Sequence, residues 1–96
     1  MPNSRGVPWS REAVEKYTQA INMCPSVAAY YTNRATCFQK MNRYDDAVAD
    51  CRRSIETDPS FVKGYLKLAQ ALRMKGDLKG AIQTINVRLS LLPLMQ

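Results

Sequence analysis

The sequence predicts an all-α fold, a right-handed α-solenoid of five helices that form about two and a half helical repeats. This prediction follows from a period of about 34 residues, in which two kinds of residue recur in register. The residues that recur with this spacing are Ala13, Ala47, Ala81, Pro25, Pro59 and Pro93. The apolar residues between them fall at helical spacing, and a period of this length indicates helical hairpins that stack on one another.

The composition limits the class of protein. The 96 residues make one domain near the lower size limit for a well-buried core, and a hydrophobic content of 46% argues against disorder. No apolar run approaches the roughly 18 residues that a membrane-spanning helix needs. The start, MPNSRGVPWS, lacks the apolar core of a signal peptide, so we expect a cytoplasmic protein without membrane contact.

The residue types argue against an enzyme. The chain has no histidine, which removes the commonest general base and metal ligand. Cys24, Cys37 and Cys51 form no CxxC pair and are predicted to be reduced thiols packed in helices. Because the sequence also lacks a glycine-rich phosphate loop, we expect no catalytic residue, no metal and no cofactor.

The net charge narrows the choice of partner. It is +6, from 14 basic and 8 acidic residues, which suits an acidic peptide, a nucleic acid or an anionic membrane surface. Nucleic-acid binding would need a continuous basic stripe with exposed aromatic residues, whereas these charges are scattered over the predicted helix faces. We therefore expect no nucleic-acid partner.

The first helix follows a short arm. Residues 1–9 contain two prolines and a glycine and are predicted to be a flexible N-terminal arm. Ser10 is predicted to cap a helix over about 11–23, with Glu12 in its first turn. A stripe of residues at helical spacing is predicted to be buried, namely Val14, Tyr17, Ile21 and Cys24.

The second and third helices form the central hairpin. Ser26 is predicted to cap a helix over about 27–41, and Asn42 and Arg43 form the turn to a helix over about 44–57. The packing residues predicted for the two helices are Tyr30, Tyr31, Ala35 and Phe38, then Ala47, Val48, Cys51 and Ile55. The alanines allow the two helices to approach closely, where a larger side chain would cost about 1–3 kcal/mol.

The last two helices form the next hairpin. Asp58-Pro59 ends the third helix, because proline disfavours helix in the residue before it. A break at Lys75-Gly76-Asp77 separates helices over about 61–75 and 78–91. Their predicted packing residues are Tyr65, Leu68, Ala69 and Leu72, then Leu78, Ala81, Ile82, Ile85 and Leu89. The domain over 10–96 thus divides into a half repeat at 10–27 and repeats at 28–61 and 62–96.

Both ends of the array are expected to be uncovered. Counting back one repeat period from the helix at 27–41 places the start of its counterpart before Met1, as in a truncated array. At the other end, apolar residues follow no polar capping helix, namely Leu89, Leu91, Leu92, Leu94 and Met95. Because repeat arrays need polar caps, we expect either a longer parent protein or a homodimer that covers these ends.

The first helix of each hairpin lines the inner groove of such an array, so its polar residues are the binding candidates. Asn33 and Lys67 occupy the same position in successive repeats, and Lys63 lies one turn before Lys67. Two lysines at this spacing repel each other, which a bound anion would relieve. Further candidates on or beside this face are Thr36, Lys40, Gln70 and Arg73. The alternative is that these are ordinary solvated surface residues.

Three stretches resemble a known family. YYTNRATCFQKM, DCRRSIETDP and FVKGYLKLAQALRMKGD are similar to the carboxylate-clamp tetratricopeptide repeat domains of co-chaperones such as CHIP and Hop, and the similarity extends over residues 10–93. In that family the clamp holds the C-terminal carboxylate and the last aspartate of the EEVD tail of cytosolic heat-shock chaperones. The resemblance places the clamp asparagine of the second repeat at Asn33 and the two basic positions of the third repeat at Lys63 and Lys67.

The resemblance also implies a partial clamp. The family's other clamp residues, a lysine and an asparagine, come from the first helix of the first repeat, and Pro2 stands where that asparagine would fall. Charge-assisted hydrogen bonds contribute roughly 1.5–3 kcal/mol each, so losing two weakens binding by about a hundredfold or more. Two functions are therefore compared: an adaptor for acidic C-terminal tails, and a self-associating structural fragment whose groove is idle.

Overall fold

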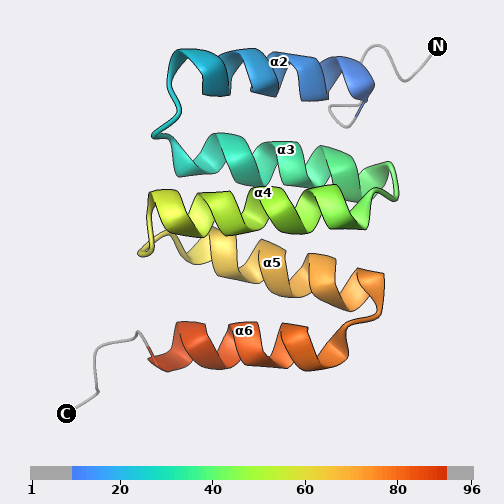
Figure 1. Cartoon of the computed structure of the whole chain (residues 1–96), viewed down its shortest axis with the longest axis vertical. Coiled ribbons are helices and arrows are strands. Elements are labelled where there is room, and N and C mark those ends of the chain that lie inside the picture. The colour runs from blue at the N-terminus through green and yellow to red at the C-terminus, as the bar shows by residue number, and fades with distance from the viewer. Residues whose placement is uncertain (1–9, 91–96) are drawn as a thin grey trace.

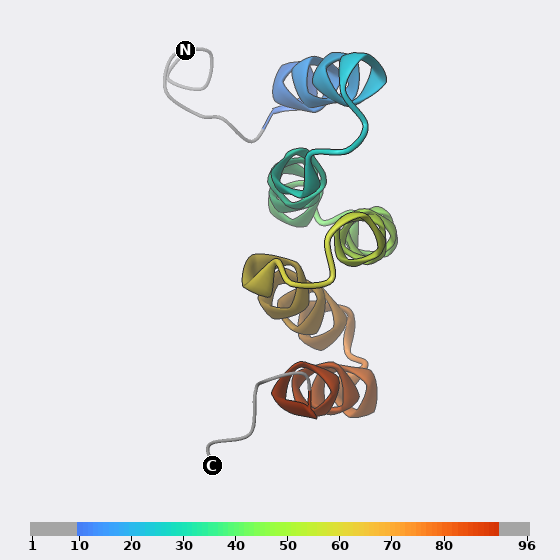
Figure 2. The same cartoon turned by 90° about the vertical axis from the view of Figure 1, so that its left-hand side faces the viewer.

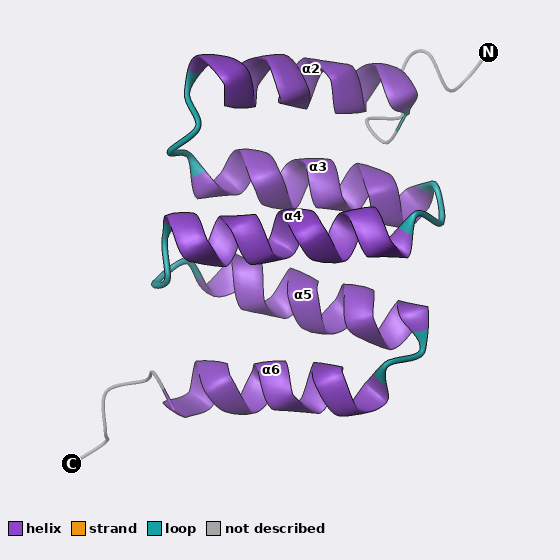
Figure 3. Ribbon diagram, in the orientation of Figure 1, coloured by secondary structure: helices purple, strands orange, loops and turns teal. Residues whose placement is uncertain are grey.

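The computed structural model describes residues 10–90, and in this range the chain folds into five helices without strands (Figures 1 and 3). The helices are α2 (Arg11–Met23), α3 (Ala28–Lys40), α4 (Tyr44–Thr57), α5 (Val62–Lys75) and α6 (Leu78–Ser90). All five predicted helices are confirmed, with bounds that differ by at most one residue. The predicted arm at 1–9 and residues 91–96 lie outside the described range.

Successive helices run antiparallel and stack along one axis, giving dimensions of 51 × 31 × 19 Å (Figure 1). The stack has two sides, with α3 and α5 on one side and α4 on the other (Figure 2). α3 contacts both α4 and α5, so residues from the first helices of two hairpins lie beside each other. This arrangement is the solenoid of hairpins that the repeat period predicts.

The helix ends follow from local chemistry, with one correction. The Ser10 Oγ accepts a hydrogen bond from the Ala13 N–H at 3.2 Å, which confirms it as the N-cap of α2. The prediction that Ser26 caps α3 is wrong, because Val27 occupies the N-cap position and makes no side-chain cap bond. Ser26 lies one residue too early, in the turn after Pro25.

The turns inside the two hairpins share one backbone conformation. Asn42 has a φ of 62° after α3, and Gly76 has a φ of 100° after α5. The two residues occupy the same position in successive repeats. Glycine and asparagine are the residues that adopt the left-handed conformation at least cost, and each here lets the chain reverse into the following helix.

The core lies where α3, α4 and α5 meet. Ala35, Ala47 and Cys51 are fully buried there, and Leu68 and Leu72 reach them from α5. The small side chains let the helix backbones approach, as the sequence predicts, and the leucines fill the space to the next hairpin.

The same repeat spacing appears in two partly buried hydrogen bonds. The Tyr31 hydroxyl donates to the Pro25 carbonyl oxygen at 2.9 Å, and the Tyr65 hydroxyl donates to the Pro59 carbonyl oxygen at 2.9 Å. In each hairpin a tyrosine thus fixes the turn that precedes its own helix.

The predicted packing of Leu78, Ile82 and Ile85 on α6 is wrong, whereas the exposure of Leu89 agrees with the expectation that this end of the array is uncovered. Leu78, Ile82 and Leu89 are about 60% exposed, and Ile85 is 37% exposed, because no described helix covers that side of α6. The counterpart of Ile82 one repeat earlier is Val48, which lies against α5 and is only 8% exposed. The last described helix therefore presents an apolar surface.

The cysteines follow the prediction in part. Cys37 and Cys51 are buried thiols, as predicted. The predicted burial of Cys24 is wrong, because this residue lies at the C-cap of α2 and is exposed.

Candidate functional site

The candidate site is built on the first two turns of α5. Lys63 and Lys67 lie one turn apart on the same face of this helix, with Lys63 exposed and Lys67 half-buried. Burial lowers the pKa of the Lys67 ammonium, and the nearby charges of Lys63 and Lys40 lower it further. Three ammonium groups from α3 and α5 therefore share one positive field. We call Lys40, Lys63 and Lys67 the lysine cluster.

Neither Lys63 nor Lys67 is neutralised by an ion pair within the described part of the chain. Among residues 10–90, the ion pairs join Arg34 to Asp50, Arg43 to Asp46 and Lys75 to Asp45. Lys63 and Lys67 take part in none of them. Like charges at this spacing destabilise a helix by a few tenths of a kcal/mol, so a bound carboxylate would relieve an unfavourable interaction.

A groove of about 520 Å³ adjoins the lysine cluster, between α5 and α6. Its polar wall contains four of the predicted site residues, Lys63, Lys67, Gln70 and Arg73. Its apolar wall contains Leu66, Ala69, Ala81, Ile82 and Ile85. Such a groove suits a ligand that carries carboxylates beside an aliphatic side chain.

The remaining predicted residues lie apart from this groove. Asn33 is half-buried on α3, and Lys40 is exposed at the C-terminal end of that helix. Neither lines the groove, although Lys40 contributes to the field at Lys67. Thr36 is 8% exposed and its hydroxyl donates to the Thr32 carbonyl oxygen at 3.0 Å, so this side chain does not present its proton to a ligand.

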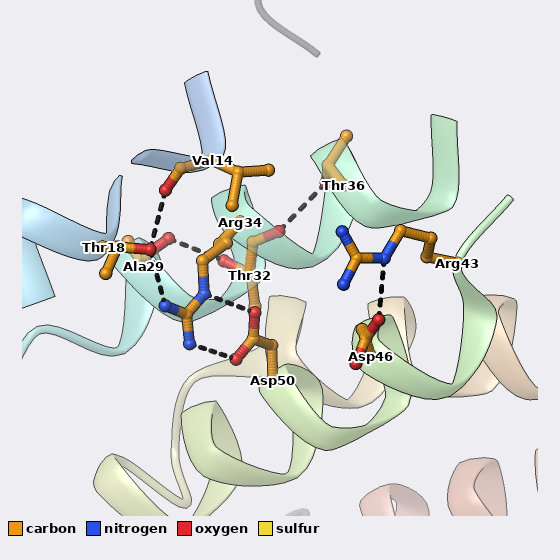
Figure 4. Close-up of polar contacts among 9 residues, drawn as sticks. All are labelled: Val14, Thr18, Ala29, Thr32, Arg34, Thr36, Arg43, Asp46 and Asp50. Carbon is orange, nitrogen blue, oxygen red and sulfur yellow. Dashed lines mark hydrogen bonds and ion pairs between the residues drawn. The ribbon is translucent and has the colours of Figure 1, made fainter. Parts of the chain in front are cut away.

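Sequence reasoning missed a polar network on the other side of α3 (Figure 4). The Arg34 guanidinium donates to both carboxylate oxygens of Asp50 at 2.7 Å, and to the Thr18 hydroxyl at 2.9 Å. The Thr18 hydroxyl in turn donates to the Val14 carbonyl oxygen at 2.8 Å. One arginine thus joins α2, α3 and α4.

This network stabilises the fold, and a comparison of successive repeats in the sequence could have indicated it. Asp50 is 3% exposed, and the hydrogen bond to its carboxylate raises the pKa of Arg34. One repeat later, Leu68 and Thr84 stand at the positions of Arg34 and Asp50. The paired change from an ionic pair to uncharged residues could have indicated that the two positions are in contact.

Residues 10–90 were also compared with what a metal site, a membrane-spanning helix and a nucleophilic cysteine require. No group of three or more histidine, cysteine or acidic side chains able to hold a metal ion occurs among residues 10–90. Within the same residues, no helix combines the length and the apolar character needed to cross a bilayer. Burial raises the pKa of the Cys51 thiol to about 12, which makes it a poor nucleophile.

Two family models of the tetratricopeptide repeat match the sequence, over residues 28–61 and 51–83. The chain is 39% identical over 71 residues to small glutamine-rich tetratricopeptide repeat-containing protein 2 of Saccharomyces cerevisiae, which covers 74% of this chain and 20% of that protein. It is 34% identical over 79 residues to the E3 ubiquitin-protein ligase CHIP of Arabidopsis thaliana, which covers 82% of this chain and 28% of that protein. The chain thus spans less than a third of these relatives.

Solved structures match over nearly the whole chain. The TPR2B domain of yeast Sti1 in complex with pHsp70 has a TM-score of 0.83 and 31% identity, covering 93% of this chain and 70% of that one. The second TPR domain of Spaghetti (RPAP3), bound to the HSP90 peptide SRMEEVD, has a TM-score of 0.80 and 27% identity, covering 95% and 83%. The resemblance to co-chaperone domains of the CHIP and Hop type is confirmed.

Proposed function

Because the chain belongs to the tetratricopeptide repeat family, we propose that it is a protein-interaction module that binds acidic C-terminal tails of cytoplasmic heat-shock chaperones. The observation that carries this proposal is the lysine cluster, in which Lys63 and Lys67 have no carboxylate partner within residues 10–90. The HSP90 and Hsp70 peptides in the similar structures support this class of ligand.

In the proposed complex, Lys63 and Lys67 bind the terminal carboxylate and the last acidic side chain. Lys40 strengthens the positive field from α3, and Asn33 supplies an amide donor from the same helix. An aliphatic residue of the tail enters the groove against Leu66 and Ile82, which binds it by burial of apolar surface. The proposed role is binding alone and requires no catalytic group.

The test is a titration with the peptide SRMEEVD, in its free-acid form and with an amidated C-terminus. We expect the free acid to bind at least about tenfold more tightly, because amidation removes one charge-assisted contact. Lys63→Ala and Lys67→Ala should each weaken binding by a similar factor. Lys79→Ala is the matched control, since it removes the same charge from an exposed position on α6 outside the groove. Equal affinities for the two peptides would refute the proposal.

Self-association is the second candidate, and the exposed apolar face of α6 favours it. Leu78, Ile82 and Leu89 offer a surface that a second copy of the chain could cover. Sedimentation velocity over a range of concentrations tests this proposal. The proposal is contradicted if the chain keeps the mass of a monomer at protein concentrations up to about 100 times those used in the peptide titration. It is supported if the chain forms a dimer that the Ile82→Gln substitution dissociates.

A further inference from the structure

A second trough lies on the opposite side of α5 from the lysine cluster. It has a volume of about 370 Å³ and separates α4 from α6, with α5 as its floor. Its apolar lining includes Ile55, Tyr65, Leu68 and Val87, and Arg52 and Thr84 lie on its two walls. The helical period of about 3.6 residues places Tyr65 and Leu68 roughly half a turn away from Lys63 and Lys67. We call this space the α4–α6 trough.

The corresponding space one repeat earlier is filled. Between α2 and α4, Arg34 rises from α3 and is held by Thr18 on one wall and Asp50 on the other (Figure 4). The positions that correspond to Arg34, Thr18 and Asp50 in the next repeat are Leu68, Arg52 and Thr84. The floor arginine is replaced by a shorter leucine, and the wall carboxylate is replaced by a threonine.

This exchange leaves no carboxylate on the α6 wall at the position that corresponds to Asp50. Asp77 also lines the trough, but it lies at the start of α6, where its carboxylate accepts a hydrogen bond from the Gly80 N–H at 2.9 Å. Arg52 is exposed on the α4 wall, and it forms no ion pair with any residue from 10 to 90. The Thr84 hydroxyl donates to the Gly80 carbonyl oxygen at 2.9 Å and therefore does not replace the missing acid. Leu68 leaves an apolar floor where the other gap has a charged side chain.

We propose that the α4–α6 trough is a binding site for an acidic amphipathic helix of a partner protein. One carboxylate of that helix pairs with Arg52, and an aliphatic side chain one turn away packs against Leu68 on the floor and Val87 on the α6 wall. The pair of Arg34 and Asp50 is the intramolecular example of this contact, a helix-borne carboxylate that meets a guanidinium in the gap between two outer helices.

A neighbouring charge limits where the carboxylate can sit. A shallower extension of about 220 Å³ continues past Arg52 along α4, and Glu56 lies on its wall. A second acidic residue placed there would be repelled, so the site favours a single acid followed by apolar residues. This differs from the tail proposed for the lysine cluster, which presents a free carboxyl terminus. The two proposals can therefore fail independently.

The probe is an acetylated and amidated helix of alanine and glutamine that carries one leucine and one glutamate four residues apart. The matched probe has glutamine in place of that glutamate. Titration into the whole chain is followed by the methyl resonances of Leu68 and Val87. We expect saturable shifts with the glutamate probe and binding at least about tenfold weaker with the matched probe.

Variants assign the contact. Arg52→Gln should abolish the difference between the two probes, whereas Arg53→Gln, the same charge change at an exposed neighbour that does not line the trough, should leave it intact. Leu68→Arg combined with Thr84→Asp copies the filled gap and should block binding. If that variant does not fold, the comparison of the two probes on the Arg52→Gln variant still tests the proposal.

Three results would overturn the proposal. They are equal affinity for the two probes, no saturable shift at Leu68 and Val87, or loss of binding in Lys63→Ala, which would place the probe on the lysine cluster instead.

Discussion

Replacing Asp50 by alanine tests whether the buried polar network holds the first three helices together. The change removes the acceptor of two hydrogen bonds of 2.7 Å from the Arg34 guanidinium. That guanidinium keeps the Thr18 hydroxyl at 2.9 Å as a partner, but loses its counter-charge. The arginine then remains mostly buried with an uncompensated charge.

The expected cost follows from burial. The side chains of Arg34 and Asp50 are 17% and 4% exposed, so the pair belongs to the buried class, for which removing one partner costs about 3–5 kcal/mol. Arg34 retains some access to water, so we expect the lower end, about 3 kcal/mol. A domain of this length has a total free energy of unfolding of roughly 5–14 kcal/mol, so the loss is a large fraction of it.

Urea unfolding followed by circular dichroism measures this cost. With an m-value of about 1.5 kcal/mol per molar urea, the midpoint should fall by about 2 M. Asp45→Ala is the control, because its exposed pair with Lys75 should contribute no more than about 1 kcal/mol. A loss below about 1 kcal/mol for Asp50→Ala would refute the reasoning.

A double variant tests whether the ion pair between Arg34 and Asp50 is needed, or whether uncharged residues at the two positions stabilise the fold as well. Arg34→Leu combined with Asp50→Thr installs the residues that the next repeat uses at the same place, Leu68 and Thr84. We expect it to recover most of the stability lost in Asp50→Ala, because a buried ion pair can be replaced by uncharged residues at little cost. A double variant as unstable as Asp50→Ala would show that the two repeats tolerate different residues here.

Three further predictions concern single side chains. Gln39→Leu should raise the free energy of unfolding by about 1 kcal/mol, because the buried Gln39 Nε2 has no hydrogen-bond partner among residues 10–90. A loss of stability would contradict this. Asn42→Ala should cost about 1 kcal/mol, because its φ of 62° is unfavourable for alanine, whereas Asn42→Gly should be nearly neutral; equal costs would exclude backbone strain as the cause. Iodoacetamide at pH 8 should modify the exposed Cys24 and spare Cys37 and Cys51, whose pKa values are raised by burial, to about 12 for Cys51; mass spectrometry showing more than one adduct on the native chain would contradict this.

The helices and their ends could be predicted because their causes are local. Pro25, Pro59 and Gly76 stop or reverse the chain wherever they occur, and apolar residues at helical spacing mark each buried face. The error at Ser26 arose because the sequence does not show which of two adjacent residues takes the capping conformation. The proximity of Lys63 and Lys67 was also predictable, since one helical turn separates them.

The sequence by itself determined the repeat, the five helices within residues 10–90 and the pair of lysines on α5, because each depends on contacts between residues close in the chain. Only the tertiary structure decided that Lys40 joins their field, that Arg34 reaches Asp50, and that Leu78, Ile82 and Ile85 of α6 are exposed. These features depend on how whole helices pack against one another, between residues that lie far apart in the chain. Helical periodicity fixes which face of a helix is apolar, but it does not fix what lies against that face.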